Sequence, residues 1–236
     1  MLFGKNLMPD GRPTMSEWPV RVWAEKELKE EFRIQARKWI KGEFEEYRFV
    51  YAPERKTAKN SYAYVFGYGK EEVLFLKKSE DGVERILLRK DQVREAAVER
   101  ELLNVQLKLY YEEKKERKEL VFPYVASVYD LYDPFLNWVL NLEQDFQPTQ
   151  AEGENPRPEK LYHESLPMYN FSLDAYRLGD GFQEYQYHKE ECRSRWMPWK
   201  KHVKEWLKID MEKGIFEVYS EGYYKRCRYC MISEDQ

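Results

Sequence analysis

The sequence has few of the features that mark secreted, membrane-spanning or strongly charged proteins. Only three of its 236 residues are cysteine, an odd number too small for a disulfide framework. No window approaches the roughly 18 apolar residues of a membrane span, and residues 1–15 lack the apolar core of a signal peptide. With 40 Lys+Arg against 43 Asp+Glu, the formal net charge is -3, so bulk charge favours no particular partner. These absences predict a cytoplasmic protein with reduced thiols.

Hydrophobic and aromatic residues are present in quantity. Hydrophobic residues make up 42% of the chain, which is enough to bury a sizeable core. Aromatic residues make up 16%, with 19 Tyr and 7 Trp. Such a content is typical of strand-rich structure or of exposed aromatic contact surfaces, and composition alone leaves both open.

The beginning of the chain divides into a lead-in and a helical pattern. Residues 1–18 carry turn-forming Pro and Gly without an apolar period, which predicts a flexible lead-in. From Val22 the pattern changes to apolar residues near helical spacing, with charged residues between them. The apolar residues are Trp23, Leu28, Phe32, Ala36, Trp39 and Ile40. The spacing predicts one amphipathic helix that begins at Val22 and ends near Gly42.

Residues 47–125 have the alternation of short strands. Seven are predicted, over 47–51, 62–66, 73–77, 83–88, 93–99, 103–111 and 120–125. Glu80-Asp81-Gly82 predicts a tight hairpin turn, because glycine accepts a positive φ. Asp133-Pro134 then predicts a helix start, followed by a short apolar face that includes Trp138. Residues 19–146 are therefore predicted to form one module, a helix plus a β module.

A second, smaller module is expected after a linker. Residues 147–160 contain three prolines and no large apolar side chain, which favours a solvated linker. Within 161–236, a strand is predicted over 182–188 and a hairpin over 215–231, whereas 203–209 is compatible with helix or strand. Residues 161–181 show no clear pattern. The prediction is an aromatic-rich α+β unit.

The strand order, the hairpin at Asp81-Gly82 and the helix bearing Trp138 together resemble the bacterial pleckstrin-homology-like fold over residues 45–146. The resemblance implies an antiparallel barrel or sandwich closed by the helix, with Trp138 as a core plug; other small barrels and half-open sheets remain alternatives. The family's lipid-phosphate loop corresponds here to residues 53–60, which carry Arg55, Lys56 and Lys59. The family's spaced Lys and Arg pair is not matched, so a plain solvated loop is favoured.

A possible metal site lies near the end of the chain. His188-x3-Cys192 and Cys227-x2-Cys230 supply one imidazole and three thiolates, the ligand count of a structural zinc. Cys227 and Cys230 would point to opposite faces if they lie in a regular strand, which would break the site. Reduced structural cysteines without a cofactor are the favoured alternative, and a redox pair is less favoured still because no strand-to-helix context supports it.

A basic and aromatic cluster follows Cys192. Its members are Arg193, Arg195, Trp196, Trp199, Lys200 and Lys201. Such a patch can stack bases and contact phosphates, as in nucleic-acid binding. It can equally pack its tryptophans inward, with the cation stems over apolar surface. The second interpretation, a buried or partner-facing patch, is favoured.

Residues for catalysis are few and form no mechanistic motif. The nearby titratable groups are His163, Asp174, Glu184 and His188, without a phosphate loop, a nucleophile elbow or a metal-binding His pair. The sequence therefore predicts a non-catalytic interaction or scaffold protein whose partner is another protein. An enzyme of unrecognised type and a nucleic-acid-binding protein are the alternatives. Convergence of several of these four residues in a deep pocket would favour an enzyme.

Overall fold

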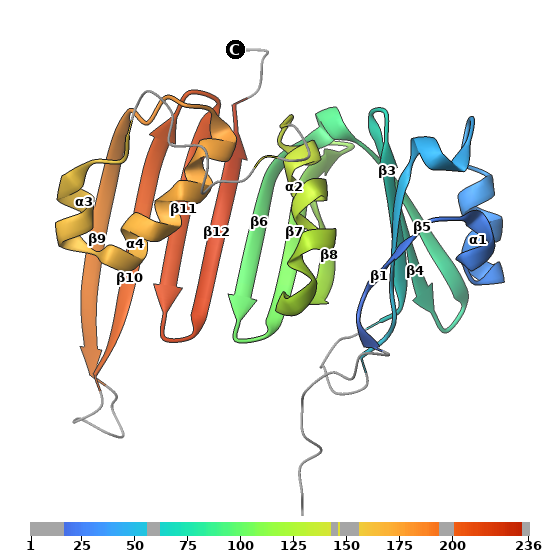
Figure 1. Ribbon diagram of the computed structural model, residues 1–236, viewed down its shortest axis with the longest axis horizontal. Coiled ribbons are helices and arrows are strands. Elements are labelled where there is room, and N and C mark those ends of the chain that lie inside the picture. The colour runs from blue at the N-terminus through green and yellow to red at the C-terminus, as the bar shows by residue number, and fades with distance from the viewer. Residues whose placement is uncertain (1–16, 56–61, 143–145, 147–155, 194–200, 233–236) are drawn as a thin grey trace, which may run out of the picture. The chain divides into compact units, whose positions relative to one another are not determined.

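A computed structural model describes residues 17–55, 62–142, 146, 156–193 and 201–232 of the chain (Figure 1). The expected lead-in over 1–18 and linker over 147–160 lie mostly outside these residues. Contacts divide the chain into two compact units, residues 1–90 and residues 91–236. Each unit has its own antiparallel sheet, so the expected α+β class is confirmed. None of the helices in the described ranges combines the length and hydropathy needed to cross a membrane.

Unit 1 contains a five-stranded antiparallel sheet in the order β1-β2-β3-β4-β5. The strands are β1 (Val20–Val22), β2 (Arg48–Ala52), β3 (Tyr64–Gly69), β4 (Glu72–Ser79) and β5 (Gly82–Arg89). The helices are α1 (Glu30–Arg37) and two 3-10 turns, η2 (Glu25–Glu27) and η3 (Phe44–Glu46). Phe32 and Ala36 of α1 are fully buried and belong to the same core cluster as Phe49, Val65 and Leu74 of the sheet.

The predicted helix from Val22 to Gly42 is wrong in its first half. Val20–Val22 pairs with β2 as an edge strand, and α1 begins only at Glu30. Trp23 is 66% exposed, with the Arg21 guanidinium 4.0 Å from its ring centroid. Leu28 is buried in the core although its backbone is extended. The spacing of apolar residues alone does not distinguish such a residue from a buried residue of a helix, and the predicted helix was therefore too long.

Unit 2 contains a seven-stranded antiparallel sheet in the order β8-β7-β6-β12-β11-β10-β9. The strands are β6 (Val93–Glu101), β7 (Asn104–Glu113), β8 (Glu116–Val125), β9 (Glu184–Arg193), β10 (Lys201–Met211), β11 (Gly214–Glu221) and β12 (Tyr224–Met231). Between β8 and β9 come η5 (Ala126–Leu131), α2 (Asp133–Val139), α3 (Glu159–Glu164), α4 (Leu166–Phe171) and η7 (Ser172–Leu178). These helical segments lie over one face of the sheet, with α2 in front of β7 and β8 (Figure 1).

The helix-covered face of this sheet consists of residue rows that run across the strands. One row contains Leu120, Leu109, Ala96, Tyr229, Phe216 and Ile209, and the next contains Phe122, Leu107, Val98, Cys227, Val218 and Leu207. The third row, nearer one end of the sheet, contains Tyr124, Val105, Arg100, Lys225, Ser220 and Glu205. Two rows are therefore apolar or weakly polar, and the third brings two cations and one carboxylate to the same face.

The strand predictions are confirmed, but the strands are distributed differently between sheets. All seven strands expected over 47–125 are present, as is the hairpin at Glu80-Asp81, and residues 203–209 are strand. The first four join β1 in unit 1, whereas the last three join β9 to β12 in unit 2. In the described part of the chain neither sheet closes into a barrel. The contact-based division at Lys90 thus differs from the expected one at 147–160, and the pleckstrin-like resemblance stays a prediction.

The helix after Asp133-Pro134 is present as α2, with Pro134 in its first turn. Phe135, Leu136 and Val139 are buried, and Phe135 is fully inaccessible. Trp138 is only half-buried, with its ring 6.2 Å from the ring of Phe135 and nearly parallel to it. The central plug of this helix is therefore Phe135, and the expectation that Trp138 is fully buried is corrected.

The difference in burial predicts unequal losses of stability for the two aromatic residues. Phe135→Ala is expected to lower the free energy of unfolding by about 3 to 5 kcal/mol, because a buried ring is replaced by a cavity. Trp138→Ala should lower it by less, since part of the indole already contacts solvent. Chemical denaturation of both variants measures the difference. A larger loss for Trp138→Ala would contradict this assignment of the core.

The hairpin between β7 and β8 turns through two lysines in an unfavourable conformation. Glu113 pairs with Glu116, and Lys114 and Lys115 between them have φ values of 53° and 69°. Positive φ at both central residues is the pattern of a type I′ turn, which favours Asn-Gly. Each side chain in the left-handed region costs roughly 1 to 2 kcal/mol. The turn is therefore strained by its own sequence.

Replacement of these lysines by Asn-Gly should stabilise unit 2. The double variant Lys114→Asn, Lys115→Gly is expected to raise the free energy of unfolding by about 1 kcal/mol, because both residues adopt a positive φ more readily than lysine, while the greater freedom of glycine in the unfolded chain offsets part of the gain. Asp81→Gly in the β4–β5 turn is the matched control, since Asp81 does not have a positive φ. Equal effects of the two changes in a denaturation midpoint would refute the explanation by turn strain.

Candidate functional site

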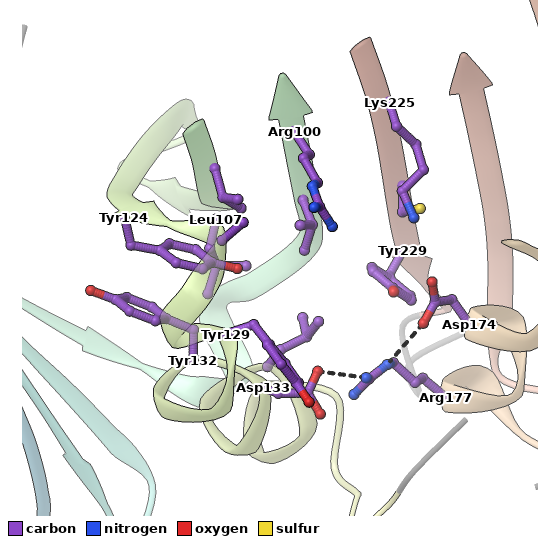
Figure 2. Close-up of a pocket in the computed structure, with 15 residues that line it drawn as sticks. Arg100, Leu107, Tyr124, Tyr129, Tyr132, Asp133, Asp174, Arg177, Lys225 and Tyr229 are labelled. Atoms are coloured by element: carbon purple, nitrogen blue, oxygen red, sulfur yellow. Dashed lines mark hydrogen bonds and ion pairs between the residues drawn. The ribbon is translucent and has the colours of Figure 1, made fainter. Parts of the chain in front are cut away.

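Unit 2 contains a cavity between the helix-covered face of its sheet and the segments η5, α2 and η7 (Figure 2). Its volume is about 190 Å³. The lining comes from strands β6, β7, β8 and β12 and from the three helical segments. The lining residues are Val98, Arg100, Val105, Leu107, Tyr124, Ala126, Tyr129, Tyr132, Asp133, Leu136, Asp174, Arg177, Lys225, Cys227 and Tyr229.

The apolar and aromatic part of the lining follows from strand alternation. Leu107 and Cys227 are buried and belong to the same row of the sheet. Tyr124, at the end of β8, stacks on Tyr132, with ring centroids 3.8 Å apart and an interplanar angle of 8°. The chain reverses through η5 between these two tyrosines, so the stack holds η5 and the start of α2 against the sheet.

Arg177 is the unusual residue of the cavity. Its exposed fraction is 3%, and its Nη2 donates to Oδ1 of Asp133 at 2.6 Å. Its Nε lies 3.8 Å from Oδ1 of Asp174, too far for a hydrogen bond. Nε and Nη1 are both inaccessible, and neither donates a hydrogen bond to any described residue. Leaving buried donors of a charged group unsatisfied costs at least about 1 to 3 kcal/mol, so this arrangement calls for an additional acceptor.

Two further cations lie at the third row of the sheet. Arg100 of β6 is directly opposite Lys225 of β12, and both line the cavity. Like charges directly opposite each other destabilise a strand pair. The Arg100 Nε donates to the Leu102 carbonyl at 3.0 Å, and the Lys225 Nζ lies 4.2 Å from the ring centroid of Phe171. Neither contact neutralises either charge.

The lining as a whole carries an excess of positive charge. Three of its residues are cationic, Arg100, Arg177 and Lys225, and two are carboxylates, Asp133 and Asp174, which gives a formal charge of +1. Both carboxylates are directed at Arg177 (Figure 2). The cations of the third row therefore remain without a carboxylate among the lining residues.

Burial changes the acidity of several lining groups. Burial raises the pKa of the Asp133 carboxyl above its ordinary value, and the attraction of Arg177 offsets part of that rise. Burial also raises the pKa of the Tyr124 and Tyr229 hydroxyls, which stay protonated and able to donate. Burial raises the pKa of the Cys227 thiol to about 12, so at neutral pH it is a poor nucleophile. The cavity thus offers hydrogen-bond donors and positive charge.

The four predicted zinc ligands are not brought together. His188 and Cys192 lie on β9, whereas Cys227 and Cys230 lie on β12, and β10 and β11 separate these strands. Three inter-strand spacings amount to roughly 14 Å, which exceeds the reach of one zinc shell. Cys227 is buried on the helix-covered face, and Cys230, three residues on, points to the other face. Among the described residues no group of three or more His, Cys, Asp or Glu is placed to hold a metal.

The other predicted sites are only partly visible. Arg195, Trp196, Trp199 and Lys200 of the basic and aromatic cluster lie outside the described residues. Arg193 and Lys201 are paired through their backbones at the ends of β9 and β10. Residues 53–60 correspond to the lipid-phosphate loop of the pleckstrin-homology-like family. Arg55 of this loop is 8% exposed, and Lys56 and Lys59 lie outside the described ranges.

The four residues considered for catalysis do not converge. Asp174 lines the cavity, whereas His163 is exposed on α3, and Glu184 and His188 are exposed on β9. The residues that the cavity does bring together were missed by the sequence analysis. Arg100 and Lys225 are 125 positions apart and meet only through the β6–β12 register, which no local pattern reveals. The one signal available in the sequence was a charged residue within the otherwise apolar and aromatic run Ala175-Tyr176-Arg177-Leu178.

A second hollow of about 360 Å³ lies mainly on the opposite face of the sheet. His188, Trp206 and Tyr219 form an aromatic row across β9, β10 and β11, with neighbouring ring centroids 5.4 and 5.3 Å apart. Lys208, Glu217 and Arg226 also line it. His188 is exposed and Trp206 and Tyr219 are half-buried, so the row is a partly exposed aromatic surface.

Comparisons of this chain with protein-family models, with curated proteins and with solved structures gave no match. The assignment of a function therefore depends on the geometry of the cavity.

The ion pair between Asp133 and Arg177 should contribute to the stability of unit 2. Asp133→Asn leaves the buried Arg177 without its charged acceptor, and we expect a loss of about 3 kcal/mol in the free energy of unfolding. Asp130→Asn, at an exposed position of η5, is the control and should be close to neutral. Thermal or urea denaturation compares the two. Equal stabilities would show that the pair is not important for folding.

Proposed function

We propose that this chain is a non-catalytic binding protein and that the cavity of unit 2 binds a small anion. The observation that carries the proposal is Arg177, whose side chain is 3% exposed while Nε and Nη1 lack acceptors among the described residues. A carboxylate, phosphate or sulfate oxygen supplies the missing acceptors once the lining moves slightly, because neither nitrogen is accessible in this conformation. Arginine presents these donors in a planar fork that matches such groups.

The cations of the third row support the same proposal. Arg100 and Lys225 face each other across β6 and β12, an arrangement that costs free energy unless a negative charge lies nearby. A bound anion would offset that repulsion and the excess charge of the lining. With a volume of about 190 Å³, the cavity is smaller than the roughly 300 to 1,000 Å³ of sites for drug-sized ligands. The proposed ligand is therefore a small molecule.

The chemistry of the lining favours binding over catalysis. The Cys227 thiol is protonated at neutral pH, and both lining carboxylates are directed at Arg177. Convergence of several of His163, Asp174, Glu184 and His188 would have favoured the enzyme alternative, and only Asp174 lines the cavity. The wider expectation of a protein partner stays a proposal, and the aromatic row of His188, Trp206 and Tyr219 is its candidate surface. Nucleic-acid binding through residues 193–201 also stays a prediction.

Titration calorimetry with inorganic sulfate, phosphate and acetate tests the proposal. At constant ionic strength, with chloride as the balancing salt, at least one of these anions should bind with a 1:1 stoichiometry. Arg177→Met should reduce its affinity at least tenfold, because the buried donors are lost. Arg226→Met is the matched control: Arg226 is exposed, and it neighbours Lys225 on β12 but points to the other face.

The control variant should bind as the wild type does. If none of the three anions binds to the wild type, or if Arg177→Met and Arg226→Met weaken binding equally, the cavity is not the anion site.

Sulfate binding should strengthen as the pH falls through the pKa of Asp133. Burial raises this pKa, and protonation removes one negative charge from the lining, so affinity is highest below the pKa and is lost as the pH rises through it. Sulfate suits the measurement because it stays charged throughout. Asp133→Asn mimics the protonated carboxyl, and its affinity should be independent of pH over this range. A pH dependence unchanged by Asp133→Asn would assign the effect to another group.

A further inference from the structure

The cationic groups of the cavity form two separate points. Arg177 comes from η7 on the helical side, whereas Arg100 and Lys225 come from the third row of the sheet. Figure 2 shows Arg177 beside Asp133 and Asp174, with Arg100 and Lys225 together in another part of the cavity. We infer that the ligand of this cavity is a dianion that carries two anionic groups on a short apolar spacer. This inference depends on the proposed function, because it specifies the ligand of the same site.

The two points lie apart in the cavity, as Figure 2 shows. Arg177 interacts electrostatically with Tyr229 of the first row, Cys227 of the second and Tyr124 of the third, and it is held at the helical side by Asp133. Lys225 and Arg100 belong to the third row. Successive rows are two residues apart along β12, or roughly 7 Å at a rise of about 3.3 Å per residue. Two anionic groups joined by a spacer fit this arrangement better than one compact anion such as sulfate.

The lining between the points is apolar and suits a hydrocarbon spacer. Val98, Leu107 and Cys227 line the cavity in the row next to Arg100 and Lys225, and Leu107 and Cys227 are buried. The thiol of Cys227 is uncharged at neutral pH. A spacer there gains from burial at about 25 cal/mol per Å² of apolar surface, whereas a charged or strongly polar linker would lose its hydration. The class that fits is an aliphatic or aromatic dicarboxylate, or a phosphate with a carboxylate at its other end.

The balance of charge connects dianion binding with proton uptake. The lining has a formal charge of +1, so two added negative charges leave one in excess. Asp133 is the group placed to take up a proton. It accepts a hydrogen bond from Arg177, interacts electrostatically with Asp174 of η7, Tyr124 of β8 and Tyr229 of β12, and shares the lining with Arg100 of β6 and Lys225 of β12. Dianion binding should therefore take up protons near the pKa of Asp133.

Calorimetry with matched ligands tests the inference. The probes are linear dicarboxylates from succinate to suberate, each compared with its own monomethyl ester, which has one charge fewer on the same chain. At the best chain length, the dicarboxylate should bind at least tenfold more tightly than its monoester. Repetition in buffers of different ionisation enthalpy measures the proton uptake. Asp133→Asn should abolish that uptake.

Variants distinguish the two points. Lys225→Gln should weaken the dicarboxylate at least fivefold and leave the monoester unchanged, because the monoester places its carboxylate at Arg177. Arg177→Met should weaken both ligands, and Arg226→Gln, on the opposite face, should weaken neither. If dicarboxylate and monoester bind equally, the dianion inference is overturned and the anion site stands. If no dicarboxylate, monoester or inorganic anion binds to the wild type, the proposed function itself fails.

Discussion

The pairing of β6 with β12 is the contact on which the rest of unit 2 depends. It joins a three-stranded meander, β6 to β8, to a four-stranded one, β9 to β12. The Glu95 carboxylate, 7% exposed, accepts from Nη2 of Arg228 and from Nη2 of Arg117, each at 2.7 Å, and a second bond from Arg228 makes that pair bidentate. Bidentate charge-assisted bonds add geometric specificity to a strand pair. The same register places Arg100 opposite Lys225 and so creates one end of the cavity.

Local signals were enough to find the strands, because each of them rests on alternation and turn residues within a few positions. They did not reveal which strands pair. β5 and β6 follow each other in the chain yet belong to different sheets, whereas Glu95 and Arg228 are 133 positions apart and share one. The predicted helix failed at Val22 for a related reason: an edge strand and a helix both bury an apolar residue every few positions, and only the pairing with β2 decides between them.

The candidate site was less accessible to sequence reasoning than the fold. The spacing of His188, Cys192, Cys227 and Cys230 predicted a zinc site. Two strands separate the first pair from the second in the sheet, so the four residues do not meet. The cavity is made by residues with no motif: an arginine within a buried 3-10 segment and two cations that face each other across strands. What marks them is unfavourable energetics, namely buried donors without acceptors and opposed like charges, and these become visible only in three dimensions.

The connection between β8 and β9 has a kinetic consequence. Arg177 and Asp133 both lie in this connection, which spans 126–183, and the strands it joins occupy opposite edges of the sheet. The contacts that bring the two meanders together join residues far apart in the sequence. Such contacts form slowly, because the entropy of loop closure is lost before they contribute to stability. The two meanders can form early from hairpins, whereas the cavity exists only after they meet. Occupancy of the cavity should therefore act chiefly on the rate at which unit 2 opens, and a ligand would extend the lifetime of the folded chain more than it hastens folding.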